Sequence, residues 1–294
     1  MVYLVLLIGI LAVSGASILI KLCDAPAMVI ASYRLTLSSV FFLSVCGFKK
    51  VNPFTAFSRR DLLLALISGL FLCLHFATWI SSLKFTSVAN SVMLVCTAPI
   101  FVAIGSFLLL KEKIKGAVIA GIIVASSGMI ALSFNESGTA ENARLGNSLA
   151  VFGAIGGAGY FLIGRKLRSR VDTLAYVSVV YSVTAVLLIV ITAALNLRIL
   201  GYQLMTYLLL LLIALVPQVI GHTSFNWALK YVSATMVALV TLGEPVGASI
   251  LAFFVLGEKI TAFQAIGGSL ILTGVGLAIW SESKQKVTMK ASIS

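Results

Sequence analysis

The chain contains one stretch of sequence twice. LKFTSVANSVMLVCTAPIFVAIGSFLLLKEKI begins at Leu83 and returns as LKYVSATMVALVTLGEPVGASILAFFVLGEKI, which begins at Leu229. The two copies align without a gap, so that Pro99 and Pro245 lie 146 positions apart. Both copies sit among apolar runs of about twenty residues, the length that a helix rising about 1.5 Å per residue needs to cross a bilayer. The duplication therefore predicts two similar halves of a helical membrane protein.

The composition agrees with a membrane environment. Hydrophobic residues make up 60% of the chain and charged residues 10%, whereas a soluble domain has roughly 45–50% and about 25%. Short connections leave no room for a soluble domain, and the polar stretch at residues 135–145 is predicted to be a loop. The apolar runs predict ten helices, over residues 2–20, 26–47, 62–82, 88–110, 115–134, 147–164, 174–195, 204–227, 233–256 and 262–280.

The number of helices in each half fixes how the halves are related. Five is an odd number, so the second copy enters the membrane from the side opposite to the first. The predicted fold class is an all-α integral membrane protein whose ten transmembrane helices form two inverted five-helix repeats. The first repeat covers residues 1–134 and the second covers residues 147–281, followed by a cytoplasmic tail at residues 282–294.

The basic residues predict the orientation of the helices. The net charge is +12, but these residues flank helix ends instead of forming a solvated basic face, so nucleic acid is not a predicted partner. With both termini in the cytoplasm, the inner connections and tail collect Lys49, Lys50, Arg59, Arg60, Lys111, Lys113, Lys115, Arg165, Lys166, Arg168, Arg170, Lys230, Lys284, Lys286 and Lys290. The outer connections receive Lys21, Lys84, Arg144, Arg198 and Lys259. This asymmetry follows the positive-inside rule and predicts a multi-pass protein of the cell membrane.

The repeated motifs resemble a known family. The pattern (A/S)-L-K-(Y/F)-x-S, a helix with proline, and (G/K)-E-(K/R)-I before a glycine-containing helix is similar to the EamA domain of the drug/metabolite transporter superfamily. Tyr33-Arg34 resembles the family's aromatic-Arg pair, whereas Tyr181-Ser182 offers no second arginine and Lys111 stands where glycine is usual. The resemblance implies a secondary active transporter of small organic metabolites such as amino acids, related compounds or drugs. We expect this transporter to be an exporter. An uptake permease or exchanger of the same fold is the alternative.

Two ionisable residues lie well inside predicted helices, Arg34 in the second and Glu244 in the ninth. A charge at the bilayer centre costs about 2.5–3.5 kcal/mol, so such residues are candidates for function. Glu244 is predicted near the midplane, where it can take up a coupling proton or bind an ammonium group. Arg34 can hold a carboxylate through two hydrogen bonds. The alternative is that the two side chains pair with each other and only stabilise the packing.

Two histidines occupy nearly equivalent places in the two halves. His75 and His222 lie 147 positions apart, in the third and eighth predicted helices. Either can change charge near neutral pH, which suits a gate or a proton relay. The alternative is a histidine hydrogen-bonded to a neighbouring helix. No metal site is predicted, because the two histidines lie on different helices and no H-E-x-x-H spacing occurs.

Trp79 and Asn226 are predicted to line the substrate path. Trp79 follows His75 by one helical turn, and Asn226 stands beside Trp227 at the end of the eighth helix. The indole rings can stack on a planar substrate. The alternative for tryptophans near helix ends is an anchor at the membrane interface.

Pro99 and Pro245, at matching places in the two copies, predict hinges. A proline inside a helix frees the carbonyl group four residues earlier, here at Val95 and Thr241. A moving joint or a polar group for the substrate path can result. The alternative is a kink that serves only packing.

The sequence favours a transporter over the other classes of membrane protein. It contains neither G-x-x-x-x-G-K-(S/T) nor G-x-G-x-x-G, so ATP is not the direct energy source and no cofactor is predicted. An enzyme would need paired carboxylates, a metal cluster or an activated nucleophile at one depth. A receptor or scaffold would not need inverted halves. The predicted partners are a small-molecule substrate and the lipid bilayer, and proton coupling stays an open alternative.

Overall fold

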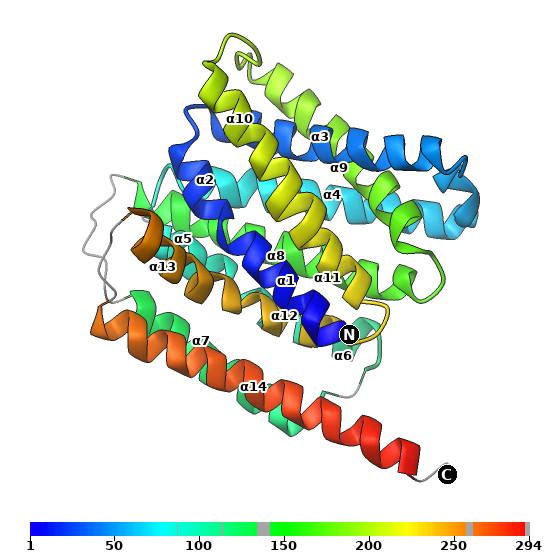
Figure 1. Cartoon of the computed structure of the whole chain (residues 1–294), viewed down its shortest axis with the longest axis vertical. Helices are drawn as coiled ribbons and strands as arrows, with labels where there is room; N and C mark the ends of the chain where they lie inside the picture. The colour runs from blue at the N-terminus through cyan, green and yellow to red at the C-terminus, as the bar shows by residue number, and fades with distance from the viewer. Residues whose placement is uncertain (87, 113, 134–141, 257–260, 292–294) are drawn as a thin grey trace.

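The computed structural model of the chain describes residues 1–86, 88–112, 114–133, 142–256 and 261–291. This part of the chain is built from helices with short connections (Figure 1). In the N-terminal half they are α1 Val2–Ser14, α2 Ala16–Leu22, α3 Ala27–Phe48, η1 Pro53–Ala56, α4 Arg59–Ser82, α5 Val88–Val95, α6 Ala98–Leu109 and α7 Gly116–Ser133. In the C-terminal half they are α8 Ala143–Arg168, α9 Thr173–Ala194, α10 Leu204–Ile213, η2 Ala214–His222, α11 Thr223–Ala228, α12 Ala234–Thr241, α13 Gly243–Leu256 and α14 Ala262–Ala291.

Many of these helices are long and apolar enough to cross a membrane. Among the described residues there are eight such spans, namely Val2–Leu22, Ala27–Phe48, Arg59–Ser82, Ser91–Leu109, Ala143–Arg168, Thr173–Ala194, Leu204–Ala228 and Ala234–Leu251. Two shorter apolar helical stretches cover Gly116–Ala131 and Ala265–Ser281. The chain therefore has the helices of a multi-pass membrane protein.

Two helices extend beyond their predicted ends. Helix α8 covers Ala143–Arg168, although the apolar run predicts only residues 147–164. The predicted loop therefore ends in helix at Ala143, while residues 134–141 lie outside the described part of the chain. Helix α14 continues to Ala291, so the segment predicted as a tail is helical as far as that residue. Hydropathy predicts only the part that lies in the bilayer, whereas Lys, Arg and Glu favour helix in water as well.

Local capping groups explain where several helices begin. The hydroxyl of Ser58 accepts a hydrogen bond from the backbone N–H of Asp61 at 3.1 Å, which caps α4. The side chain of Asp172 caps α9 in the same way. Such caps satisfy N–H groups that the first turn leaves free. The last turn of α8 carries Arg165, Lys166 and Arg168, where the helix dipole favours positive charge.

Helices from the two halves pack against each other in pairs. Helix α4 packs along α8, α3 along α9 and α7 along α14, while α1 packs against η2 and α11. In Figure 1, α7 and α14 lie side by side at one end of the molecule, and α3, α9 and α10 lie toward the other. Hydroxyl pairs join α3 to α9, with Ser32 2.8 Å from Thr192 and Ser39 2.6 Å from Ser182. Such bonds matter between membrane helices, because lipid removes the hydrophobic advantage of packing.

The α7–α14 contact depends on glycines. A Cβ atom at Gly128 would lie 2.5 Å from the carbonyl oxygen of Gly267, and one at Gly274 would lie 2.5 Å from that of Gly121. These distances leave no space for a side chain. Because an early residue of α7 faces a late residue of α14 and the reverse, the two helices run antiparallel.

Each half also contains a helix broken near its middle. Helix α5 ends at Val95 before α6 begins at Ala98, and α12 ends at Thr241 before α13 begins at Gly243. Pro99 and Pro245 lie in the first turns of α6 and α13, where the N–H group that proline lacks is not needed. The breaks thus stand just before the prolines. Movement at these places stays a prediction.

Candidate functional site

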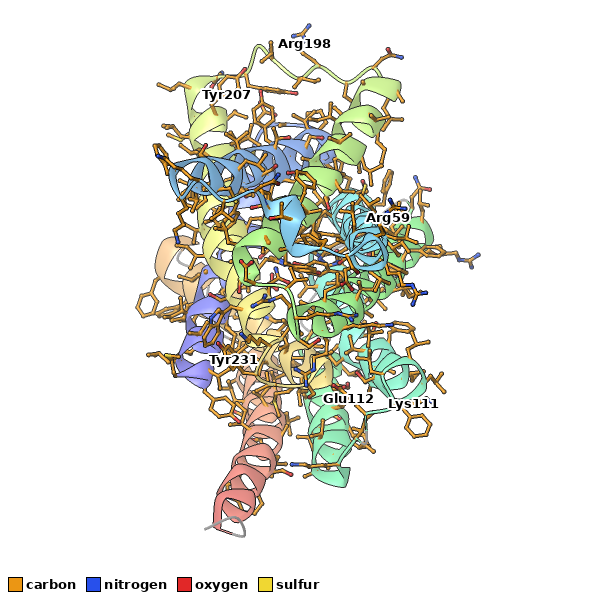
Figure 2. The ribbon with its side chains drawn as sticks, turned by 90° about the vertical axis from the view of Figure 1, so that its right-hand side faces the viewer. Arg59, Lys111, Glu112, Arg198, Tyr207 and Tyr231 are labelled. Carbon is orange, nitrogen blue, oxygen red and sulfur yellow. The ribbon has the colours of Figure 1, made fainter. Side chains whose placement is uncertain are left out.

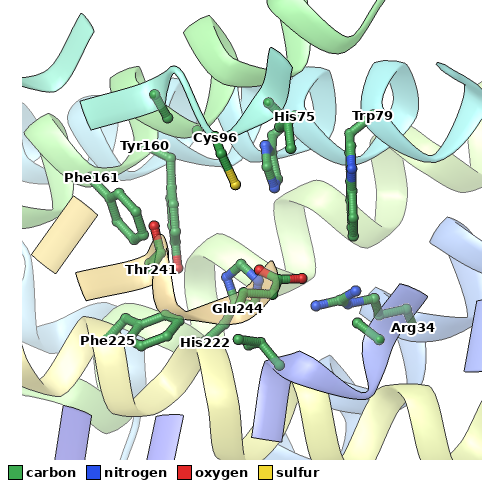
Figure 3. Close-up of a pocket in the computed structure, with 15 residues that line it drawn as sticks. Arg34, His75, Trp79, Cys96, Tyr160, Phe161, His222, Phe225, Thr241 and Glu244 are labelled. Atoms are coloured by element: carbon green, nitrogen blue, oxygen red, sulfur yellow. The ribbon is translucent and has the colours of Figure 1, made fainter. Parts of the chain in front are cut away.

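The structure has a cavity between the two halves, close to both helix breaks (Figure 3). Its volume is about 60 Å³, enough for about four or five water molecules. The N-terminal half contributes Val13, Ala16, Arg34, His75, Trp79, Val95, Cys96 and Ala98. The C-terminal half contributes Gly157, Tyr160, Phe161, His222, Phe225, Thr241 and Glu244. The predicted residues Arg34, His75, Trp79, His222 and Glu244 are therefore brought together in one place.

Arg34 is held on two sides. Its side chain is fully buried, and its Nε donates a hydrogen bond of 2.7 Å to Oε1 of Gln218. The guanidinium carbon lies 4.3 Å from the centre of the Phe76 ring, a distance at which a cation is attracted to the ring face. Among the described residues, Nη1 and Nη2 have no hydrogen-bond partner. One edge of a buried cation is thus left unpaired.

Glu244 faces the same cavity from the first turn of α13. A carboxylate is favoured there by the positive end of the helix dipole. No ion pair links it to Arg34 in the described part of the chain, where the ion pairs are Arg165–Glu112 and Arg170–Asp61. The direct pairing considered from the sequence is therefore not formed in this conformation. At the equivalent place in the first repeat, Ala98 lines the cavity without a charge.

The two histidines are neighbours across the cavity, with ring centres 6.3 Å apart. Nδ1 of His75 lies 2.8 Å from the carbonyl oxygen of Gly153 on α8. Because a carbonyl only accepts, this nitrogen carries the proton. His75 thus makes the bond to a neighbouring helix that was the alternative interpretation, and it also lines the cavity. Nδ1 of His222 is buried without a hydrogen-bond partner among the described residues.

Trp79 lies in the interior, with 5% of its surface exposed. Its ring stacks on His75 at 5.8 Å and 16°. The interpretation of Trp79 as an interfacial anchor is therefore wrong, because a position one turn from the end of α4 is covered by the packing of α8. Trp79 instead forms part of the cavity wall.

Asn226 lies behind the cavity wall instead of in it. Its side chain is fully buried and donates hydrogen bonds to the hydroxyls of Tyr160 and Tyr181. Tyr160 lines the cavity, so Asn226 acts on it only through that ring. Neither Pro99 nor Pro245 lines the cavity, although their neighbours Ala98 and Glu244 do.

A cluster around Arg165 joins the halves at one end of the bundle, one turn beyond the cavity residue Phe161. Nε of Arg165 lies 3.0 Å from Oε1 of Glu112, the glutamate of the first repeated motif. Nη1 donates to the carbonyl oxygen of Leu229 at 2.7 Å. We call these three residues the Arg165 latch. Figure 2 shows Glu112 in the same lower region as Tyr231.

Gln218 is the residue that sequence reasoning did not place in the site. It lies on η2, a wide π-helical segment around Pro217. The signal was a polar residue beside Pro217 in an apolar run, which predicted a hinge or a polar group for the cavity but no partner for Arg34. Its bond to Arg34 depends on how η2 packs against α3, and no local pattern predicts that packing. Within the described residues, no group of three or more His, Cys, Asp or Glu could hold a metal ion.

Comparisons with known proteins agree with this architecture. The sequence model of the EamA-like transporter family matches residues 1–134 and 144–280. An uncharacterized transporter of Archaeoglobus fulgidus is 29% identical over 257 residues, which cover 84% of this chain and 87% of that protein. The uncharacterized transporter YetK of Bacillus subtilis is 26% identical, with 92% and 84% covered. A protein known from a crystal structure has the same fold, with a TM-score of 0.81 at 18% identity over 97% of this chain and 98% of that one.

Proposed function

Since the chain belongs to the EamA-like transporter family, we propose that it is a secondary active transporter of the cell membrane. It exports small organic metabolites, such as amino acids, related compounds or drugs, by alternating access. The observation that carries the proposal is the cavity between the halves, where an arginine from one half and a carboxylate from the other line one space. Charged groups inside a bilayer are costly and mark substrate or ion pathways.

The packing supports two inverted five-helix repeats, residues 1–134 and 147–281. The contacts keep their pattern when the halves are exchanged, since α4 against α8 corresponds to α1 against η2 and α11. The antiparallel α7–α14 pair is what an axis in the membrane plane would produce, because it turns α7 onto α14. With these two helices, the eight longer spans make ten transmembrane helices in our proposal.

The Arg165 latch supports a cycle of alternating access. It ties the end of α8 to Glu112 after α6 and to Leu229 before α12, so it draws elements of both halves together. We infer that its release opens the cavity toward that face. The basic residues around it support a cytoplasmic location of this face, and our proposal puts both chain termini on the same side. Labelling Gln203→Cys from outside, but not Thr55→Cys, tests the orientation.

Transport by the purified protein in liposomes tests the function. The measurement is counterflow against a panel of amino acids, nucleobases and drugs, followed by flux under pH gradients of either sign. We expect Glu244→Gln to fold normally and to lose pH-driven flux, because the amide keeps the size of the side chain without its charge. The matched control is Asp24→Asn, an exposed carboxylate. Wild-type pH-driven flux in the Glu244→Gln protein would remove Glu244 from the mechanism. If the pH gradient drives solute only in the direction of accumulation, the protein takes up solute instead of exporting it.

A further inference from the structure

We propose that the transported compound carries a carboxylate group, which binds end-on to Nη1 and Nη2 of Arg34. The inference rests on the proposed function, because it takes the cavity between the halves as the substrate site. It narrows the substrate from any small organic metabolite to an organic acid or a compound with an acidic group. It also gives Gln218 a specific role, since its side chain accepts a hydrogen bond from Arg34.

The geometry of Arg34 leaves one place for such a group. A guanidinium binds a carboxylate through two parallel N–H bonds, from either the Nε side or the Nη1–Nη2 end. Gln218 already occupies Nε at 2.7 Å, and Phe76 covers one face of the guanidinium at 4.3 Å. The end-on edge remains, and its two nitrogen atoms have no partner among the described residues. Gln218 is thus a positioning residue, because its bond to Nε fixes the orientation of the free Nη1–Nη2 edge of Arg34.

The surroundings of Arg34 have hydrogen-bond donors to spare. Nε2 of Gln218 and Nε1 of Trp79 are also buried without partners in the part of the chain that the structure describes. Buried donors that stay unpaired are uncommon, and a buried charge without a counter-ion destabilises a protein strongly. A carboxylate ligand brings two acceptor oxygens and a negative charge to these groups, whereas a neutral amide brings one acceptor oxygen without charge and a cation brings neither.

Glu244 is the other carboxylate that could meet Arg34. It lies on the same cavity but forms no ion pair with Arg34 in the described structure. The carboxylate of Glu244 and that of the substrate therefore compete for one arginine. Replacing Glu244 with glutamine removes both the competitor and its repulsion, so this variant binds a simple carboxylate more tightly than the wild type.

The size of the cavity selects the probe. A volume of about 60 Å³ is well below the roughly 300–1,000 Å³ of a pocket for a drug-sized ligand. Acetate fits this space, and acetamide has nearly the same shape without the charge. The pair therefore separates recognition of a carboxylate from recognition of size.

The experiment measures the melting temperature of the purified full-length protein in detergent against sodium acetate at constant ionic strength. We expect a saturable rise with acetate and none with acetamide. Arg34→Gln abolishes the rise, and Gln218→Leu weakens acetate binding about tenfold, the scale of one lost charge-assisted hydrogen bond. Glu244→Gln strengthens binding, and Arg198→Gln, at an exposed arginine, leaves it unchanged.

Equal shifts with acetate and acetamide would overturn the inference, as would an undiminished acetate response in Arg34→Gln. If Arg34→Gln does not fold, the wild-type comparison of acetate with acetamide and the Gln218→Leu titration decide. A purely structural Gln218 would lower the melting temperature without changing the acetate midpoint, and that result contradicts its positioning role. Because binding is measured without flux, acetate binding in a protein that exchanges no solute would contradict the proposed function alone.

Discussion

The two copies of the repeat contribute the same residues to the α7–α14 contact but different residues to the cavity between the halves. In the contact, Gly121 and Gly128 of α7 meet Gly274 and Gly267 of α14, so each copy supplies the same residues. In the cavity, Ala98 of one copy stands where the other has Glu244. The contact has stayed symmetric because both helices need the same close approach. The cavity is not symmetric, and under the proposed function this difference suits a substrate that is itself asymmetric.

This difference separates structure from chemistry. A symmetric scaffold lets two halves exchange conformations with similar energy, as alternating access requires. In the proposed transport cycle, distinct groups on the two sides of the cavity give the bound compound one orientation. Arg34 on α3 has no counterpart in the second repeat, where the sequence offers Tyr181-Ser182. The two regions therefore predict different responses to mutation.

Glycine replacements in the α7–α14 contact have the largest expected effect. Gly128→Val and Gly274→Val each place atoms against a carbonyl oxygen that lies 2.5 Å from the new Cβ. Overpacking of this kind typically costs about 1–3 kcal/mol, and more where the backbone itself blocks the space. We expect both variants to lose thermal stability by similar amounts. Gly276→Val is the control, since nothing lies within 4 Å of its Cβ. If the protein tolerated one replacement but not the other, the two helices would not contribute equally to the contact, which would contradict this prediction.

Moving the carboxylate between the copies is the next test. The double variant Ala98→Glu with Glu244→Ala carries the same charge at the repeat-equivalent place. We expect it to transport at least about tenfold more slowly than wild type, a change of about 1.4 kcal/mol in the barrier, because the proposed coupling carboxylate then faces the cavity from the other repeat while Arg34 has not moved with it. Proteoliposome flux measures the effect. Wild-type flux would mean that the two copies are interchangeable in the cavity after all.

Release of the Arg165 latch has a smaller expected effect. Arg165 and Glu112 are 28% and 26% exposed, and a partly exposed ion pair contributes up to about 1 kcal/mol. Glu112→Gln should therefore speed labelling of the cavity thiol Cys96 from the latch side about two- to fivefold. The charge exchange Glu112→Arg with Arg165→Glu should slow it only in part, because it restores the ion pair but leaves the carbonyl oxygen of Leu229 without its donor. An unchanged labelling rate in Glu112→Gln would show that this pair does not close the path.

The smallest expected effect concerns the start of the motif after α6. Lys111 has a φ of 54°, a left-handed conformation that costs a residue with a Cβ atom roughly 1 kcal/mol. The second copy has Gly257 at the equivalent place in the sequence. Lys111→Gly should raise the free energy of unfolding by up to about 1 kcal/mol, while Lys111→Ala should not. A melting curve distinguishes the two, and equal stability of both variants would rule out backbone strain here.

The sequence predicted the helical membrane architecture because about twenty apolar residues in a row leave few other structures. It predicted Arg34 and Glu244 as candidates because charge in a bilayer is costly, and the structure brings both to one cavity. It did not predict the bond between Gln218 and Arg34, since a neutral amide in an apolar run gives a weaker signal than a charge. It misplaced Asn226, which lies behind the cavity wall, because the distance of a residue from a helix end does not tell which neighbour covers it. These details depend on packing between helices far apart in the chain.

Access to Cys96 from the two faces of the membrane tests the central claim most directly. Cys96 lines the cavity, and replacing Cys23, Cys46 and Cys73 leaves it as the single thiol. A membrane-impermeant thiol reagent is added to sealed vesicles of either orientation, and the labelled fraction is followed over time. The account predicts labelling from each face, with a reagent on one side blocking later reaction from the other. Labelling from one face only, however long the exposure, would contradict alternating access through this cavity.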